Sequence, residues 1–145
     1  EDFINQKFMV IGGDDPEGFW QTLFTDSLPK CKMYFNTSVI EASTIKYAVN
    51  SFLSTKVAFF NQLYDICQAN GADYSLVRQV LTHDQRIGNS HMMVPGPDMS
   101  RGFGGACFPK DTSALLKYAE SINAPLSVLD AAVKKNTLLR LTGPK

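Results

Sequence analysis

The segment FGGACFPKDTSALL, residues 103–116, holds the residue types best suited to covalent chemistry. Cys107 follows a pair of glycines and precedes Asp111, which we predict to be the N-cap of a helix. The free N–H groups at a helix N-terminus and the cation of Lys110 would lower the pKa of a nearby thiol and favour the nucleophilic thiolate. Two interpretations of Cys107 follow: it is a nucleophile, or it is a small residue of the core.

A second candidate group lies in IKYAVN, residues 45–50. Lys46 and Asn50 are four residues apart, so they share one face if this segment is helical. An ammonium and a carboxamide side by side can stabilise an oxyanion or hold a water molecule. The alternative is a polar face that is only solvated.

Arg86 lies in DQRIG, residues 84–88, near the start of a predicted loop from about residue 83 to residue 110. This loop is rich in Gly and Pro, and a loop of such length in a compact domain usually has a function. The planar guanidinium can bind a sugar hydroxyl or a phosphate. It can equally fix its own loop through an ion pair.

The remaining cysteines and histidines indicate packing rather than chemistry. Cys31 lies beside a predicted strand and Cys67 on the apolar side of a predicted helix, and we expect both to be packing residues. The sequence has two histidines and no CxxC or Cys/His cluster, so no metal site is predicted. Free thiols fit a reducing, cytoplasmic location best.

Composition narrows the class of protein. The 145 residues are enough for one domain with its own core, and 44% apolar and 19% charged residues are typical of a globular chain. The formal net charge is zero and there is no basic cluster, which argues against binding to nucleic acid. No apolar run approaches the length needed to span a membrane.

The elements that must position these residues are mainly helical. Residues 38–69 contain neither Pro nor Gly, and their apolar residues recur mostly in steps of three and four, which predicts one long helix ended by Asn70 and Gly71. Further apolar residues lie off the main stripe, so a second packing surface is needed, and a subunit interface would provide one.

Shorter elements flank this helix. We predict strands at residues 7–11 and 32–35, with a helix at 17–27 between them. Helices are also predicted at 74–81, capped by Asp73, at 111–121 and at 127–139. The first strand is not followed by the G-x-G-x-x-G spacing of a dinucleotide-binding turn.

Taken together, several segments resemble the UDP-glucose/GDP-mannose dehydrogenase family, and most closely its members that act on UDP-glucose. In order, the matching text is EASTIKYAVNSFLSTKVAFFNQL, GADYSLV, DQRIG, PGP and FGGACFPKDTSALL, from about residue 41 to residue 118. KFMVIGG at the front and VLDAAVKKN at the back match more weakly. The pattern GG-x-C-x-x-KD is fairly specific, and more so behind a K-Y-x-x-N helix.

The resemblance implies a fold that is mainly α. Residues 38–145 would form a central helical dimerisation domain, and residues 1–37 would be the α/β remnant of a Rossmann domain. Family members oxidise the C6 alcohol of a nucleotide sugar to a carboxylate with two molecules of NAD⁺, through a cysteine thiohemiacetal and a thioester. NAD would be bound mainly by a domain that this sequence lacks, so the chain alone is expected to be inactive. Its expected partners are UDP-glucose and a second copy, packed along the 41–69 helix.

The resemblance also implies roles for individual residues. Cys107 matches the catalytic cysteine. Lys46 and Asn50 match the pair that stabilises oxyanions and positions water, and Asp111 matches the carboxylate that orients or activates water. The residues expected to contact the nucleotide sugar are Arg86, Phe103, Gly104 and Lys110, and Lys110 is also expected to contact the cofactor.

Three alternatives remain open at this point. The chain could be a non-catalytic helical dimerisation module of the same fold. It could serve a dehydrogenase for another nucleotide sugar, such as GDP-mannose or a UDP-N-acetyl sugar. A central domain of the 6-phosphogluconate or hydroxyacid dehydrogenase type also uses a helical Lys and Asn, but its chemistry needs no thiol. The longer stretch PGPDMSRGFGG departs from some family members and leaves the sugar contacts open.

Overall fold

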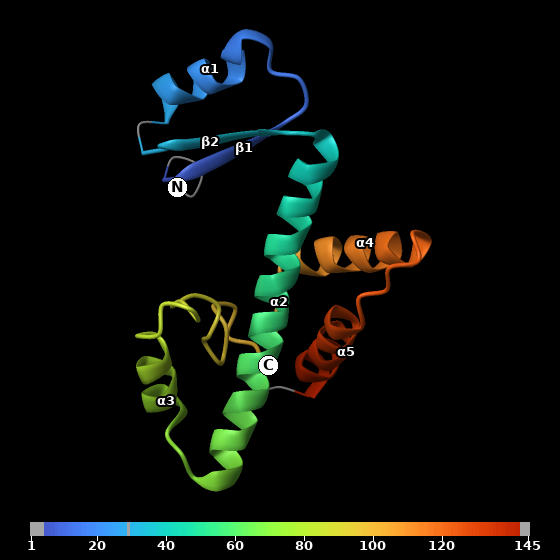
Figure 1. Ribbon diagram of the computed structural model, residues 1–145. Coiled ribbons are helices and arrows are strands. Elements are labelled where there is room, and N and C mark those ends of the chain that lie inside the picture. The colour runs from blue at the N-terminus through green and yellow to red at the C-terminus, as the bar shows by residue number, and fades with distance from the viewer. Residues whose placement is uncertain (1–4, 29, 143–145) are drawn as a thin grey trace. The chain divides into compact units, whose positions relative to one another are not determined.

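Helices dominate the residues that this computed structural model describes, which are 5–28 and 30–142 (Figure 1). The ends of both predicted domains, residues 1–4 and 143–145, lie outside the described residues. The order of elements is β1 (Phe8–Gly12), the 3₁₀ helix η1 (Pro16–Gly18), α1 (Phe19–Ser27), β2 (Met33–Thr37), α2 (Val39–Asn70), α3 (Tyr74–Leu81), α4 (Cys107–Ser121) and α5 (Ser127–Thr142). The predicted fold class, mainly α with one long helix behind a short α/β segment, is confirmed.

Contacts divide the chain into two compact units, Glu1–Lys46 and Tyr47–Lys145. In the first unit, β1 and β2 pair in parallel, from Phe8 opposite Met33 to Gly12 opposite Thr37. Two adjacent parallel strands need a crossover connection, and the segment that contains α1 provides it. The domain boundary predicted between residues 37 and 38 lies just before α2, whereas the two compact units divide within α2, between Lys46 and Tyr47, so that boundary stays a prediction.

Local capping explains where α2 begins and ends. The Glu41 carboxylate accepts hydrogen bonds from the Ser38 backbone N–H at 2.8 Å and the Ser38 hydroxyl at 2.9 Å, while Ser38 Oγ accepts from the Glu41 N–H at 3.2 Å. This is a capping box, and the bond from the Ser38 N–H lowers the pKa of Glu41. At the other end Gly71 adopts φ +76°, which lets the Ala72 N–H donate to the Cys67 carbonyl at 2.9 Å.

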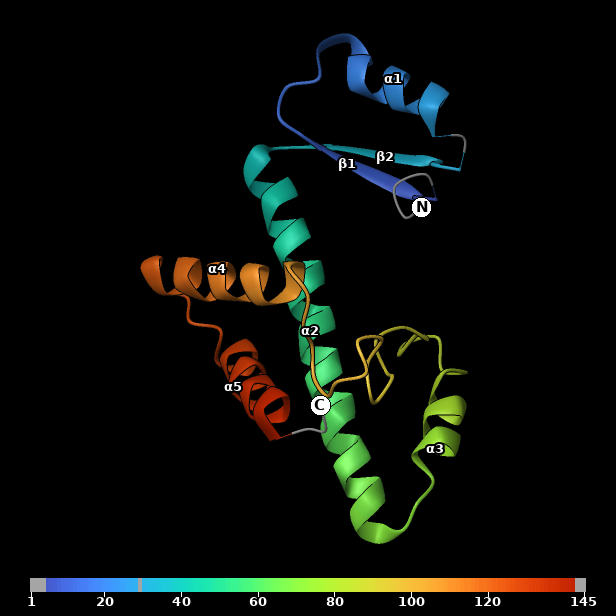
Figure 2. The same ribbon diagram turned by 180° about the vertical axis from the view of Figure 1, so that it is seen from behind.

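In the second unit, α3 lies on one side of α2, and α4 and α5 lie on the other (Figures 1 and 2). The buried cluster under α3 consists of Phe60, Cys67, Tyr74 and Met92. Cys67 is only 3% exposed and Cys31, in the first unit, only 4% exposed. The expectation that both thiols are packing residues is therefore confirmed.

Replacing Tyr74 with Phe is expected to destabilise this cluster by about 1–2 kcal/mol, because the Met92 carbonyl would lose its buried partner. The Tyr74 hydroxyl donates to that carbonyl at 2.7 Å. Burial raises the pKa of Tyr74 from 10.0 to about 12. The neutral phenol therefore stabilises the fold fully below pH 10, and its contribution is lost as the pH rises through about 12. Urea unfolding of both proteins across this range measures the effect, and an equal alkaline loss in the Phe variant would contradict it.

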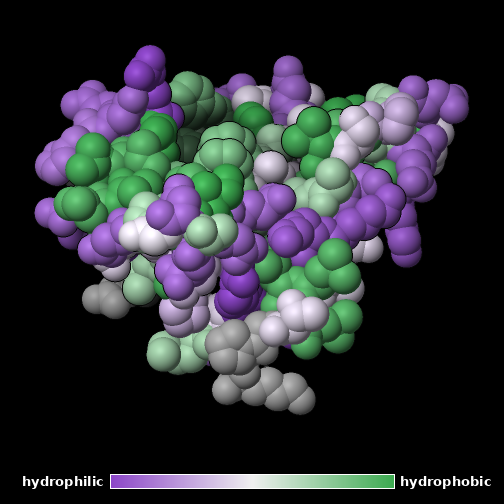
Figure 3. Space-filling model, turned by 90° about the horizontal axis from the view of Figure 1, so that it is seen from below, coloured by the Kyte–Doolittle hydropathy of each residue, from purple (hydrophilic) through white to green (hydrophobic). Residues whose placement is uncertain are grey.

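Many large apolar side chains stay exposed on the described surface. Figure 3 shows hydrophobic areas on one face, separated by hydrophilic ones. On α2 the large apolar residues that are exposed are Val39, Ile40, Ile45, Val49, Phe52, Phe59 and Ile66. Among the residues described, no helix combines the length and the apolar character needed to cross a bilayer.

Candidate active site

Helix α4 begins at Cys107, four residues earlier than predicted. Its N-cap is Ala106, which makes no side-chain capping bond, so the prediction that Asp111 caps this helix is wrong. The first-turn N–H groups of a helix have no partners within it, and therefore Pro109, which lacks an N–H, is tolerated in this turn. Cys107 is accordingly the first residue of the helix and does not belong to the loop before it.

The Asp111 side chain is buried between two nitrogen donors. Its residue is 1% exposed, and its Oδ2 accepts a hydrogen bond from Asn50 Nδ2 at 2.6 Å. Its Oδ1 accepts from Lys110 Nζ at 2.5 Å, and this bond raises the pKa of Lys110. A buried carboxylate needs such partners because its desolvation would otherwise be very costly. The need for these bonds explains why Asp111 turns inward instead of capping the helix.

This cluster lies one helical turn from an accessible thiol. Cys107 is exposed and precedes Asp111 by four residues in α4, so both lie on one side of that helix. Asn50 donates one Nδ2 hydrogen to Asp111. The carboxamide of Asn50 also has a second N–H hydrogen and an acceptor oxygen. The arrangement therefore combines a thiol with a carboxamide whose orientation is fixed. Lys46 lies in α2 four residues before Asn50, at the end of the first compact unit.

A cleft of about 440 Å³ opens beside the start of α4. Gly105 and Phe108, on either side of Cys107 in the sequence, belong to its lining, as do Phe103 and Gly104, which were predicted to contact a sugar. The complete lining is Val57, His91, Met93, Gly96, Pro97, Asp98, Gly102, Phe103, Gly104, Gly105 and Phe108. The cleft therefore has an aromatic wall, since the Phe103 and Phe108 rings meet edge to face with centroids 6.2 Å apart.

His91 contributes to this cleft, which the sequence did not indicate. Its ring lies 5.6 Å from that of Phe108, centroid to centroid. Burial, and then the nearby charge of Lys56, lower the pKa of His91, so the neutral imidazole is favoured. Among the residues described, no group of three or more His, Cys, Asp or Glu side chains is placed to hold a metal ion.

Arg86 is placed differently from the other predicted site residues. Its Nε donates to Asp84 Oδ1 at 2.9 Å and its Nη2 to Asp84 Oδ2 at 2.6 Å. This paired bond lowers the pKa of Asp84. The side chain is 88% exposed. Of the predicted site residues, the cleft lining includes only Phe103 and Gly104. The ion pair that fixes its own loop is present in this chain, and contact of Arg86 with a sugar hydroxyl or a phosphate stays a prediction.

Two buried asparagines that the sequence pattern did not single out lie behind the cleft wall. Asn61 of α2 bonds to the backbone of Gly102, and Asn136 of α5 bonds to that of Phe103. Asn is unfavourable in the interior of a helix. An Asn within a predicted helix is therefore the only feature of the sequence that could have indicated a tertiary role for these two residues.

Comparison with known proteins shows the family to which this chain belongs. The model of the UDP-glucose/GDP-mannose dehydrogenase family, central domain, matches residues 40–138. The UDP-glucose 6-dehydrogenase of Rickettsia typhi is 35% identical over 140 residues, 95% of this chain and 31% of the relative. That of Rhizobium meliloti is 36% identical over 142 residues, 94% of this chain and 31% of the relative.

A solved structure agrees with these sequence matches. The UDP-glucose dehydrogenase from the hyperthermophilic archaeon Pyrobaculum islandicum superposes with a TM-score of 0.81 at 29% identity, over 94% of this chain and 30% of that one. The chain thus spans a little under a third of the length of these relatives. On this evidence of sequence and fold, the chain belongs to the UDP-glucose/GDP-mannose dehydrogenase family, whose central domain it contains.

Proposed function

We propose that this chain is the thiol-bearing part of an NAD-dependent UDP-glucose 6-dehydrogenase, which oxidises UDP-glucose to UDP-glucuronate. The observation that carries the proposal is the accessible Cys107 at the first residue of α4, one turn before the Asp111–Asn50 pair. The names of the similar proteins support UDP-glucose as the substrate.

In the proposed reaction the C6 alcohol is first oxidised to an aldehyde. Cys107 Sγ then adds to the aldehyde carbon while the thiol proton passes to the oxygen, which gives a thiohemiacetal. Loss of the C6 hydride and of the hydroxyl proton converts it to a thioester. Water attacks the thioester carbon, the C–S bond breaks, and the carboxylate and the free thiol are released.

The polar residues would act where charge develops on the substrate. Donors such as the Asn50 carboxamide and the Lys46 ammonium would stabilise the oxyanions that form in the addition and hydrolysis steps. Asp111 would keep Asn50 oriented through the 2.6 Å bond and would help orient the attacking water. Phe103 and Gly104 would contact the sugar from the cleft wall, and Arg86 would contact it only after leaving Asp84.

NAD, when bound, accepts the hydrides in both oxidation steps. The described residues suit only a small part of its site. The Lys110 side chain is 62% exposed, so its ammonium can approach a cofactor while it stays bonded to Asp111. The sequence has no G-x-G-x-x-G phosphate-binding turn, and the chain alone is therefore proposed to be inactive.

We further propose that residues 1–37 are a remnant of the dinucleotide-binding domain and that residues 38–145 form the central domain of a cytoplasmic homodimer. Free cysteines support the reducing location. The exposed apolar residues of α2, among them Phe52 and Phe59, support a partner along residues 41–69. Sedimentation equilibrium tests the dimer, and a monomer at all concentrations would remove it.

Protection of Cys107 by the 6-aldehyde of UDP-glucose tests the proposed function without NAD. Reversible addition of the thiol to the aldehyde should slow alkylation of Cys107, by about tenfold or more at saturating aldehyde. UDP-glucose itself, which has no aldehyde, should protect less, and the 6-aldehyde of glucose without the nucleotide is the control for recognition. Peptide mass spectrometry reads the modification at each cysteine.

Each outcome of that experiment separates the candidate functions. Equal protection by both aldehydes would indicate a reactive thiol without nucleotide recognition. No protection by either would favour a helical dimerisation module that has the fold without the chemistry. Stronger protection by the aldehyde of GDP-mannose or of a UDP-N-acetyl sugar would keep the mechanism and change the substrate.

A further inference from the structure

The backbone of the cleft wall is held by two buried carboxamides from different helices. The Phe103 N–H donates to Asn136 Oδ1 at 2.6 Å, and Asn136 Nδ2 donates back to the Phe103 carbonyl at 3.0 Å. The Gly102 N–H donates to Asn61 Oδ1 at 3.1 Å. Residues 102 and 103 belong to no helix or strand, so Asn136 and Asn61 supply the partners that a strand neighbour would provide.

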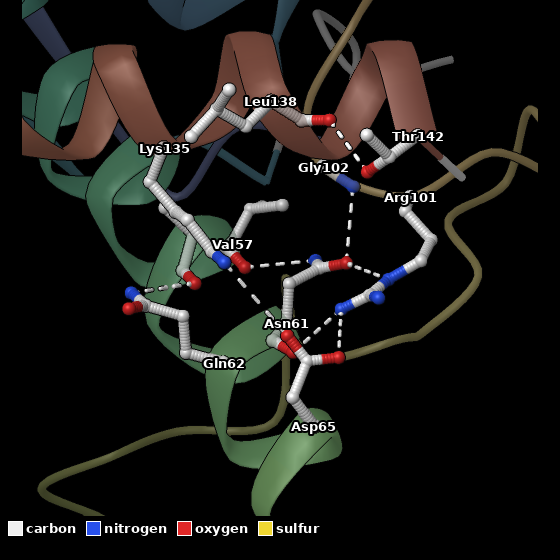
Figure 4. A network of polar contacts seen from close by, with 10 residues as sticks. Val57, Asn61, Gln62, Asp65, Arg101, Gly102, Lys135, Leu138 and Thr142 are labelled. Carbon is white, nitrogen blue, oxygen red and sulfur yellow. Dashed lines mark hydrogen bonds and ion pairs between the residues drawn. The ribbon is translucent and has the colours of Figure 1, made fainter.

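Both asparagines are buried, and further contacts hold Asn61 in place. Asn61 is 1% exposed and Asn136 is 8% exposed. Asn61 Nδ2 donates to the Val57 backbone carbonyl at 2.9 Å. Arg101 Nη2 donates to the backbone carbonyl of Asn61 at 2.9 Å and forms an ion pair with Asp65 at 2.6 Å. Figure 4 shows Asn61 of α2 directed toward Arg101 and Gly102. A buried network in which the oxygen and the nitrogen of each carboxamide have a partner favours one geometry, because a buried polar atom without a partner is costly.

The fit between loop and helix depends on a glycine. Gly102 has φ +73°, and a Cβ placed there would collide with Asn136 Oδ1. A larger residue would therefore strain the backbone and push Asn136 away from Phe103. With glycine in place, the 5% exposed Phe103 is part of the cleft wall and contacts Phe108, the residue after Cys107.

We propose that Asn136, assisted by Asn61, is a positioning residue for the reaction of Cys107. By clamping both backbone polar groups of Phe103, Asn136 sets the wall against which an aldehyde lies when the thiol attacks it. The contribution to catalysis rests on the proposed function, but the clamp itself is a property of this chain. In this proposal neither asparagine contacts the reacting atoms.

The variant Asn136→Asp distinguishes a role in hydrogen bonding to Phe103 from a role in packing alone, because the two side chains have nearly the same volume. An ionised carboxylate accepts from the Phe103 N–H but repels the Phe103 carbonyl. A protonated carboxyl has one O–H donor and one acceptor oxygen, so it restores both bonds. Burial raises the pKa of such a carboxyl, which brings the change into a mildly acidic range. The bond to the Phe103 carbonyl should therefore be lost at neutral pH, which loosens the clamp, and return in acid.

The experiment measures amide hydrogen exchange by NMR on the 145-residue chain, with rates corrected for the intrinsic effect of pH. In the wild type, the Phe103 and Gly102 amides should be protected by about a hundredfold or more, although they lie outside helices and strands. In Asn136→Asp the Phe103 protection should fall about tenfold at neutral pH, which corresponds to one buried hydrogen bond, and recover in acid. Thr137→Ala, which changes an exposed neighbour on α5, is the matched control and should leave Phe103 unchanged.

The same variants then receive the aldehyde of UDP-glucose. The protection of Cys107 by the aldehyde should fall about tenfold in Asn136→Asp at neutral pH, while the rate of alkylation without aldehyde stays within about twofold of wild type.

An unprotected Phe103 amide in the wild type would overturn the clamp, and no variant is needed for that result. Recovery of the amide without recovery of aldehyde protection would overturn the positioning role. Failure of the wild type to be protected by aldehyde would instead remove the proposed function and leave the amide result standing.

Discussion

Iodoacetamide should alkylate Cys107 at least about a hundredfold faster than Cys31 or Cys67 in the native chain, because a buried thiol reacts only after local opening. Cys107 is exposed at the start of α4, whereas Cys31 and Cys67 are 4% and 3% exposed. Cys67 also belongs to the cluster with Phe60 and Tyr74. Mass spectrometry of peptides from timed samples gives the three rates separately.

Unfolding the chain in urea provides the control for this measurement. The burial of Cys31 and Cys67 then disappears, and the three rates should approach one another. Comparable rates in the native chain would show that the start of α4 does not present its thiol to solvent. The role proposed for Cys107 would then lose its structural basis, since the reaction begins with attack by that sulphur.

Replacing Asp111 with Ala should reduce the free energy of unfolding by about 3 kcal/mol, as is usual when one partner of a buried polar group is removed. The Asn50 amide would lose the acceptor that it reaches at 2.6 Å, and the 1% exposed site would hold a cavity. Urea unfolding followed by circular dichroism measures the change.

Asp111→Asn is the matched variant, because its amide oxygen can still accept from Asn50 in nearly the same volume. It should cost about 1 kcal/mol, since the bond from Asn50 is kept while the charge and the bond from the largely solvated Lys110 are lost. Lys110→Met should have a still smaller effect, because the Lys110 ammonium is largely in solvent. If Asp111→Ala were as stable as Asp111→Asn, the carboxylate would not hold α4 against α2.

Local sequence signals were sufficient for the extent of α2. The three- and four-residue spacing of its apolar residues and the Asn70-Gly71 stop define a helix that the structure gives as Val39–Asn70. Such signals act within a few residues, through caps and side-chain periodicity, and therefore need no knowledge of the rest of the chain. The burial of Cys67 on the apolar stripe followed from the same pattern.

The start of α4 could not be obtained in this way. Asp111 looks like a cap because Asp is favoured at that position, but a buried bond to Asn50, 61 residues away, outweighs the local preference. With Asp111 turned inward, the helix extends back to Cys107 and the thiol becomes its first residue. Likewise, only the structure shows that Arg86 is paired with Asp84.

By itself, the sequence determined the helices, the family and the residue types of the site, because periodicity, capping and motif order are properties of short segments. Only the tertiary structure decided which side chains meet. Asn50 reaches Asp111, and Asn136 reaches Phe103 33 residues away, because α2, α4 and α5 pack together around buried polar groups that must find partners. That requirement operates through space, and no spacing along the chain records it.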